Sequence, residues 1–141
     1  MLGRLVVLKP VALLLVRVVV GAVLLAHGYP KLFGDTQRYL EGFPQMGFPA
    51  WAAYVAGTVE FFGGLLLIVG LFTRIAAFFA SGEMFVAFLN VHWKLAERGV
   101  FGFLGNSGDE LPLALCVAAF LLLTLGAGAI SLDRLLFKEK A

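Results

Sequence analysis

The chain has 141 residues, of which 61% are hydrophobic and 14% are charged, and its mean hydropathy is +0.96. This composition is far from that of a soluble globular domain and indicates a membrane protein. The net charge of +2 is too small and too dispersed to indicate a nucleic-acid partner, and the length suits one domain. The single cysteine, Cys116, excludes a dithiol relay within the chain.

Four apolar stretches are each long enough to cross about 30 Å of hydrocarbon, which takes about 20 helical residues. They are residues 10–29, 50–72, 74–93 and 110–130. The sequence therefore predicts an all-α fold, in which residues 1–141 form a single integral membrane four-helix bundle. One short cytoplasmic turn and two longer outer loops would join the helices.

The distribution of basic residues predicts the orientation in the membrane. Four spans place both termini and the turn before Arg74 on one side, with six basic residues: Arg4, Lys9, Arg74, Arg134, Lys138 and Lys140. The other side has four: Lys31, Arg38, Lys94 and Arg98. Because Lys and Arg are enriched in cytoplasmic loops, we expect a bacterial-type cytoplasmic membrane protein with both termini in the cytoplasm.

Small and polar residues form a stripe along each of the first three predicted helices. The stripes are Arg17, Gly21, Leu24, Gly28 and Lys31; then Gly57, Glu60 and Gly64; then Ala76, Ala80, Glu83, Ala87 and Asn90. Small residues let neighbouring helices approach closely, so these stripes should face the bundle interior. The phenylalanines of the third helix would then face lipid or a partner protein.

Three ionisable residues, Arg17, Glu60 and Glu83, fall near the middle of the predicted hydrocarbon layer. Burying one such charge costs about 3 kcal/mol on insertion scales, so the three should be paired or protonated. We expect Arg17 to form a two-bond pair with one glutamate, Glu60 first. The other carboxyl should then hold a proton and exchange it, as quinone reduction requires, although the three can also form a purely structural core.

A second polar group is predicted near the outer face. It contains His27, Lys31, Asn90, His92, Asn106 and Glu110. The helices contain no His-x-x-x-His spacing, so no metal site is predicted. We expect these residues, with His27 pointing into the bundle end, to hold the polar head of a small amphiphile such as a quinone. The alternative for Lys31 is a side chain that extends to lipid headgroups.

The first outer loop, residues 32–49, contains Asp35, Gly42 and Pro44 at positions that predict a short helix capped by Asp35 and ending at Gly42. Its aromatic residues favour packing at the membrane surface or over the bundle mouth, in preference to a mobile lid.

Several ordered motifs resemble the DoxX family of small four-span membrane proteins, over about residues 12–136. They are His27-Gly28-Tyr-Pro-Lys31, Gly57-x-x-Glu60-x-x-Gly63-Gly64, Gly70-Leu-Phe-Thr73-Arg74, Ser81-Gly82-Glu83-Met84, His92, Asn106-x-Gly108-x-Glu110 and Gly126-x-Gly128-x-x-Ser131-Leu-Asp133. The resemblance implies a bacterial inner-membrane four-helix bundle. It also implies redox-linked membrane subunits, because the family's namesakes are associated with thiosulfate:quinone oxidoreductase. Asp109 stands where many relatives have glycine, which adds an acid at the bundle mouth.

Two function classes follow from these residues. The favoured one is a quinone-linked redox component or oxidoreductase subunit, in which Arg17, Glu60 and Glu83 relay protons. Such a protein would hold no cofactor of its own beyond a quinone, and it would need a partner, such as another membrane or redox subunit, to carry electrons. The chain could also form a homo-oligomer. The alternative is a non-catalytic structural or assembly subunit of a larger membrane complex. A transporter is disfavoured because no inverted repeat is evident.

Overall fold

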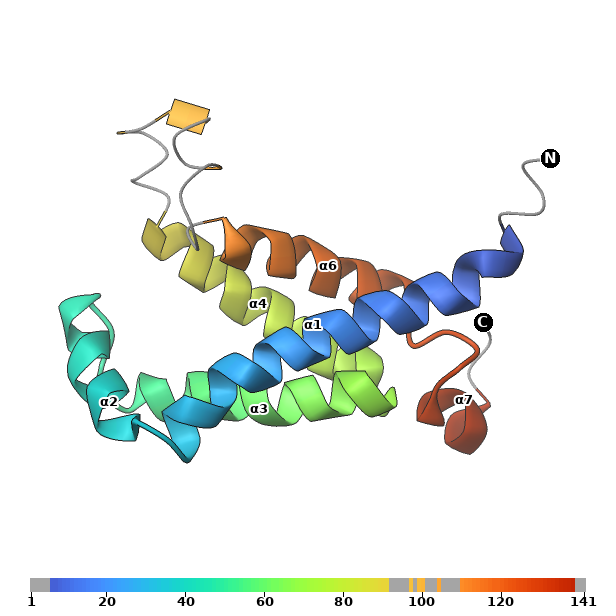
Figure 1. Cartoon of the computed structure of the whole chain (residues 1–141), viewed down its shortest axis with the longest axis horizontal. Helices are drawn as coiled ribbons and strands as arrows, with labels where there is room; N and C mark the ends of the chain where they lie inside the picture. Colours follow the sequence, from blue (N-terminus) through green and yellow to red (C-terminus); the bar gives the residue numbers. More distant parts are fainter. Residues whose placement is uncertain (1–5, 92–96, 98, 101–103, 105–109, 139–141) are drawn as a thin grey trace.

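The computed structural model describes residues 6–91, 97, 99, 100, 104 and 110–138, and these residues contain helices and no strand. The helices are α1 (Lys9–Leu32), α2 (Thr36–Gln45), α3 (Ala52–Val69), α4 (Thr73–Val91), α6 (Leu111–Leu125) and α7 (Leu132–Phe137) (Figure 1). The prediction of an all-α fold is therefore confirmed.

Two helix pairs form the bundle. α1 packs along α3, α4 packs along α6, and α3 and α4 join the pairs (Figure 1). We call the end where α1 begins and α7 lies the Arg17 end, and the opposite end, beside α2, the Lys31 end. α1 also contacts α6, and at the Arg17 end Leu13 of α1 lies beside Gly128, which follows α6.

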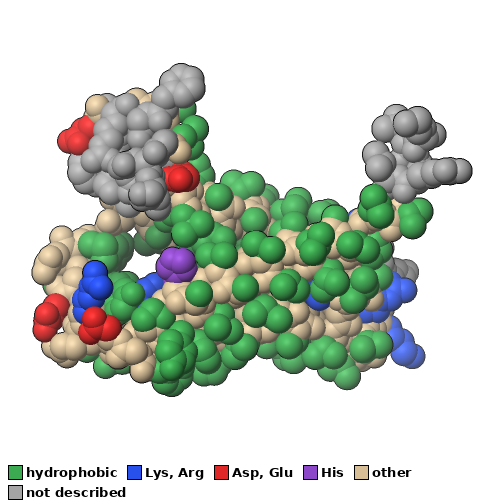
Figure 2. All heavy atoms as spheres, viewed as in Figure 1, with side chains coloured by type: hydrophobic (Ala, Val, Ile, Leu, Met, Phe, Trp, Pro, Cys, Tyr) green, Lys and Arg blue, Asp and Glu red, His purple; other side chains and the backbone are tan. Residues whose placement is uncertain are grey.

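Two segments are long and apolar enough to cross a membrane by length and composition. They are Val6–Leu32, with a mean hydropathy of 2.3, and Ala52–Val69, with 1.8, while Leu111–Leu125 is a shorter apolar helix. Large apolar side chains are exposed over the exterior (Figure 2), among them Val19, Phe62, Phe78 and Phe120. An apolar exterior of this kind suits contact with lipid.

Glycines make the contact between α1 and α3 unusually close. A Cβ atom added to Gly21 would lie 2.6 Å from the carbonyl oxygen of Gly64, and one added to Gly64 would lie 2.6 Å from that of Gly21. One added to Gly28 would lie 2.9 Å from the carbonyl oxygen of Gly57. The predicted stripes on these helices are thus confirmed, since Arg17, Gly21, Leu24, Gly28, Gly57, Glu60 and Gly64 are all buried.

The last predicted span ends at its glycines, whereas the predicted end of the loop helix at Gly42 is wrong. The stretch 110–130 is helical only to Leu125, because Gly126 and Gly128 have φ angles of 78° and 79° and end the helix. The chain then turns into α7. In the first outer loop, α2 continues past Gly42 to Gln45, since Pro44 can adopt the helical φ angle. Asp35 occupies its N-cap position without a side-chain cap hydrogen bond.

Candidate functional site

A buried ion pair joins α1 to α3. The ammonium group of Lys31 donates a hydrogen bond to the Glu60 carboxylate, and the two side chains are 13% and 5% exposed. Helical side chains lean toward the N-terminus of their own helix. Because α1 and α3 are antiparallel, Lys31 and Glu60 lean toward each other along the contact. Lys31 is therefore a paired residue of the bundle and does not extend to headgroups.

The prediction that Arg17 pairs with a glutamate is wrong. Its Nη1 donates to the carbonyl oxygen of Ala127 at 2.5 Å, and its Nη2 donates to that of Ile130 at 2.7 Å. Since Gly21 faces Gly64, Arg17 is level with position 68, eight residues or about 12 Å from Glu60. The lean of both side chains toward their own N-termini increases that separation.

The hydrogen bonds of Arg17 satisfy backbone carbonyl groups that follow the end of α6. Carbonyl groups outside a helix need donors where water is scarce, and residues 126–131 are not helical. Arg17 is 1% exposed and supplies two donors from its planar guanidinium. It therefore anchors the segment between α6 and α7.

Glu83 of α4 lies near the Lys31–Glu60 pair, which supplies its charged neighbours. Its Oε2 atom is buried and has no hydrogen-bond partner among the described residues. A buried polar atom without a partner is costly, and it is a natural contact point for a water or ligand atom.

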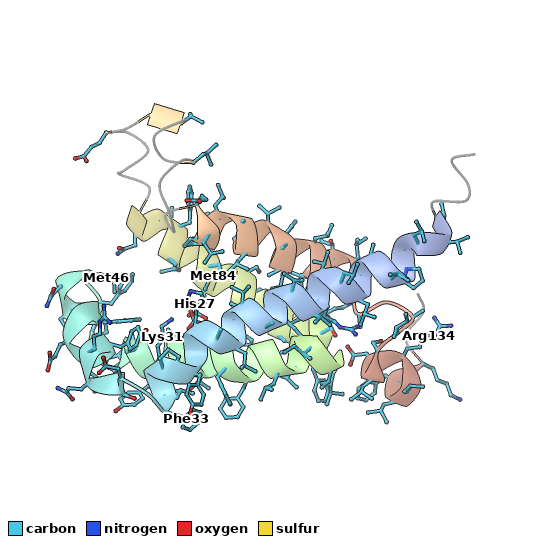
Figure 3. All side chains as sticks on the ribbon, viewed as in Figure 1. His27, Lys31, Phe33, Met46, Met84 and Arg134 are labelled. Atoms are coloured by element: carbon cyan, nitrogen blue, oxygen red, sulfur yellow. The ribbon has the colours of Figure 1, made fainter. Side chains whose placement is uncertain are left out.

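Lys31, Glu60 and Glu83 line one groove of about 590 Å³ between α2, α3 and α4. Its walls are mostly apolar and include Tyr39, Phe43, Met46, Trp51, Phe79 and Met84. Figure 3 shows Lys31 in the space between the end of α1 and α2, with Met46 on the α2 side. The Nζ atom of Lys31 also lies 5.8 Å from the centre of the Tyr39 ring, within cation–π range.

The outer polar group predicted from the sequence is only partly assembled. Lys31 and Asn90 both line the groove, and the Asn90 amide donates to the carbonyl oxygen of Met46 at 3.0 Å, which ties α4 to the end of α2. Glu110 instead lines a separate groove of about 630 Å³ along α6. Its Oε2 atom is buried and lacks a hydrogen-bond partner within the described ranges.

His27 does not point into the bundle end as predicted. It is exposed on α1, and its Nδ1 atom lies 2.9 Å from the carbonyl oxygen of Val23, one turn earlier. His92 and Asn106 lie outside the described residues. Within the part of the chain that the structure describes, no group of three His, Cys, Asp or Glu side chains could hold a metal ion.

Sequence reasoning missed the role of Asp133. This residue is 4% exposed, and its carboxylate accepts hydrogen bonds from the backbone N–H groups of Phe72 at 2.6 Å and Thr73 at 2.8 Å. Its own N–H donates to the carbonyl oxygen of Gly70. Asp133 thus caps the start of α4 from a distant segment. In the sequence, only its place in the motif Gly126-x-Gly128-x-x-Ser131-Leu-Asp133 marked this residue. A cap that comes from 60 residues away leaves no local sequence pattern.

The groove also depends on α2. The sequence predicted that this segment packs either at the membrane surface or over the bundle mouth. α2 has no buried residue, yet its Tyr39 and Phe43 side chains form one wall. The helix therefore covers the groove without joining the core.

Comparison with known proteins gives the family. The DoxX family profile matches residues 12–93, and no solved structure matches the chain. An uncharacterized protein of Haemophilus influenzae is 36% identical over 131 residues, covering 93% of this chain and 95% of the relative. "Putative oxidoreductase CatD" of Bacillus subtilis is 31% identical, covering 90% and 88%. "Inner membrane protein YqjF" of Escherichia coli is 33% identical, covering 94% and 97%. The chain belongs to the DoxX family of membrane proteins.

Proposed function

We propose that this protein is a quinone-linked redox component of a bacterial-type cytoplasmic membrane, acting as a subunit of an oxidoreductase complex. The observation that carries the proposal is Oε2 of Glu83, a buried carboxyl oxygen with no hydrogen-bond partner among the described residues. It lies in a mostly apolar groove beside the Lys31–Glu60 pair. Apolar cavities with a few convergent polar groups are typical ligand sites.

The walls of the groove suit a flat, lipophilic ring. Its volume of about 590 Å³ lies within the range of small-molecule sites, and Tyr39, Phe43 and Phe79 offer aromatic contacts. Trp51 and Phe79 line the groove and are 65% and 54% exposed, so the groove opens on the apolar exterior. A quinone dissolved in the bilayer could therefore enter without crossing water.

The polar residues of the groove suit proton-coupled reduction. Reduction of a quinone to a quinol takes up two electrons and two protons. Lys31 can donate a hydrogen bond to a ring oxygen, with its charge offset by Glu60. Glu83, whose Oε2 atom has no hydrogen-bond partner among the described residues, can transfer one of the two protons to a ring oxygen, and water supplies the second. Arg17 is not part of this relay, because its guanidinium binds two backbone carbonyls.

Electrons must come from another subunit. The lone Cys116 cannot form an intrachain disulfide, so a dithiol donor would have to lie on a partner chain. The name of the Bacillus subtilis relative supports oxidoreductase chemistry, and that of the Escherichia coli relative supports an inner-membrane location. We propose that α1, α3, α4 and α6 form four spans, with the Arg17 end in the cytoplasm.

Quinone binding tests this proposal directly. Trp51 lines the groove, so a short-chain quinone added to the purified full-length protein should quench its fluorescence saturably. Gly82→Leu should abolish this quenching, because Gly82 lines the groove and an added Cβ meets no atom within 4 Å, which lets the larger side chain fill the space. Gly42→Leu is the matched control, since Gly42 is also open and lies outside the groove lining.

Glu83→Gln separates the redox role from simple binding. The variant should assemble normally and bind quinone, yet lose quinone reduction in membranes that contain the partner chains, because an amide cannot deliver the proton. Glu41→Gln, on the exposed face of α2, should leave reduction unchanged. Unchanged quinone binding in Gly82→Leu, or full reduction in Glu83→Gln, would refute the proposal.

A second candidate is a non-catalytic assembly subunit. Its specific support is the face of α4, where Phe78, Phe79 and Phe85 are 60%, 54% and 51% exposed. Under this reading Glu83→Gln lowers the amount of assembled complex without changing the turnover of each complex, and no quinone binds.

A further inference from the structure

α7 and the turn before α4 form a distinct surface at the Arg17 end. After α6 ends at Leu125 the chain turns, and α7 lies apart from the end of α6, beside the α3–α4 turn (Figure 1). The rings of Phe72 and Phe137 lie 5.5 Å apart across this contact. We call the surface of α7 together with Phe72 and the C-cap residue Lys138 the α7 platform.

The platform is apolar, and the described part of the chain leaves it exposed. Leu135, Leu136 and Phe137 are 76%, 63% and 57% exposed, and Phe72 is 47% exposed. Four apolar side chains of this exposure, on one short helix and the turn beside it, mark a surface that meets lipid or another molecule.

Basic residues flank these apolar side chains. Arg134 and Lys138 are both exposed, and Figure 3 shows Arg134 at the edge of the molecule. Among residues 126–138 the one acid is Asp133, and it is buried and bound to backbone N–H groups. In the view of Figure 2 blue side chains gather at this end without red ones. The exposed charge of the platform is therefore positive.

Two buried charges fix the platform to the bundle. Arg17 holds the carbonyls of Ala127 and Ile130 ahead of α7, and Asp133 within α7 binds the N–H groups of Phe72 and Thr73. A six-residue helix is too short to be stable alone, so these bonds determine where α7 lies. They hold it with its leucines and basic side chains directed outward.

We propose that the α7 platform is a membrane-surface anchor that binds anionic phospholipid headgroups through Arg134 and Lys138, while Leu135, Leu136 and Phe137 enter the apolar layer below the headgroups. Interfacial helices combine an apolar side with Lys and Arg in this way. Basic residues beside an anionic leaflet each strengthen binding roughly fivefold. Headgroups are favoured over a protein partner because basic side chains accompany the apolar ones, and because the rest of the exterior is also apolar and suits contact with lipid.

Lipid titration of the purified full-length protein tests the anchor. Phosphatidylglycerol and phosphatidylcholine with identical acyl chains are added to protein in neutral detergent, and bound lipid is counted by native mass spectrometry. The wild type should prefer phosphatidylglycerol, and the preference should weaken with salt. The double variant Arg134→Gln/Lys138→Gln should lose roughly 10- to 30-fold of that preference. Both side chains are exposed, so the fold should be unaffected.

Arg38→Gln is the matched control, because Arg38 is an exposed basic residue on α2 at the opposite end. It should retain the phosphatidylglycerol preference. Equal binding of the two lipids, or an equal loss in the control, would overturn the anchor. So would a dimer that dissociates on Leu135→Ser/Leu136→Ser, because the platform would then be an interface between copies. None of these outcomes depends on quinone binding.

Discussion

At the scale of single residues, the direction in which a helical side chain leans decides which charges meet. Along the antiparallel α1–α3 contact, the backbone of Lys31 lies opposite position 54, which is six residues or about 9 Å along the helix axis from Glu60. The two side chains nevertheless pair, because each leans toward the other. Arg17 leans the other way and binds backbone carbonyls instead. Each of these buried charges therefore binds the polar group that lies on the side toward which its side chain leans.

The Lys31–Glu60 pair predicts a strong effect of removing one partner. Lys31→Gln should lower the free energy of unfolding by about 3 kcal/mol, because it leaves the Glu60 carboxylate buried without its cation. Thermal unfolding in detergent measures the loss. The double variant Lys31→Gln/Glu60→Gln should recover most of it, and Lys9→Gln, at an exposed site on the same helix, should have no effect. Equal stability of Lys31→Gln and wild type would contradict the pairing.

Replacing Asp133 should cause a smaller and local loss of stability. Asp133→Asn should cost about 1–2 kcal/mol, since an amide has one acceptor oxygen for the two N–H groups and no charge to favour the start of α4. Hydrogen exchange at Phe72 and Thr73 should accelerate. Asp35→Asn is the control, because Asp35 occupies an N-cap position without capping α2. Similar exchange in both variants would argue against the long-range cap.

At the scale of elements, glycine sets the distance between α1 and α3. Gly21 and Gly64 bring the two backbones close enough that neither position has room for a methyl group. The same closeness lets the short reach of a glutamate meet a lysine on the neighbouring helix. Packing by small residues is the usual basis of helix association in lipid.

Gly21→Ala should therefore destabilise the bundle by about 2 kcal/mol, because the added Cβ would lie 2.6 Å from the Gly64 carbonyl and push the helices apart. Gly63→Ala, next to Gly64 on α3, should be neutral or stabilising, since its Cβ meets no atom within 4 Å and alanine favours the helix. SDS-induced unfolding compares the two variants. Greater damage from Gly63→Ala would show that the helices pack differently.

The sequence predicts the elements and their inner faces better than it predicts their partners. Periodicity identified the buried stripe of α1 and the small-residue stripe of α3, because the face on which residues lie depends only on their spacing within one helix. It could not tell that Arg17 would meet Ala127, since that contact depends on where α6 ends. It also could not place Tyr39 and Phe43 in the same groove as Glu83, because α2 has no buried face of its own.

At the scale of the whole molecule, the two ends of the bundle differ in chemistry. The Lys31 end has an apolar groove containing one ion pair and a carboxyl, that of Glu83, whose Oε2 atom has no hydrogen-bond partner among the described residues. The Arg17 end has charges bound to backbone groups, which fix the terminal segment. The first arrangement leaves a group available for chemistry, whereas the second uses its buried charges for structure. This division is the basis for locating function at the Lys31 end.

The proposed function depends on a quinone binding in the groove beside Glu83. The most direct measurement is photolabelling of the purified full-length protein with an azido-quinone, followed by peptide mass spectrometry, with unlabelled quinone as competitor. A quinone bound in the groove should label groove residues of α2 and α4, such as Phe43 and Phe79, and unlabelled quinone should compete with this labelling. The labels should be lost in Gly82→Leu. Labels spread over the apolar exterior, unaffected by competitor or by Gly82→Leu, would contradict binding in the groove.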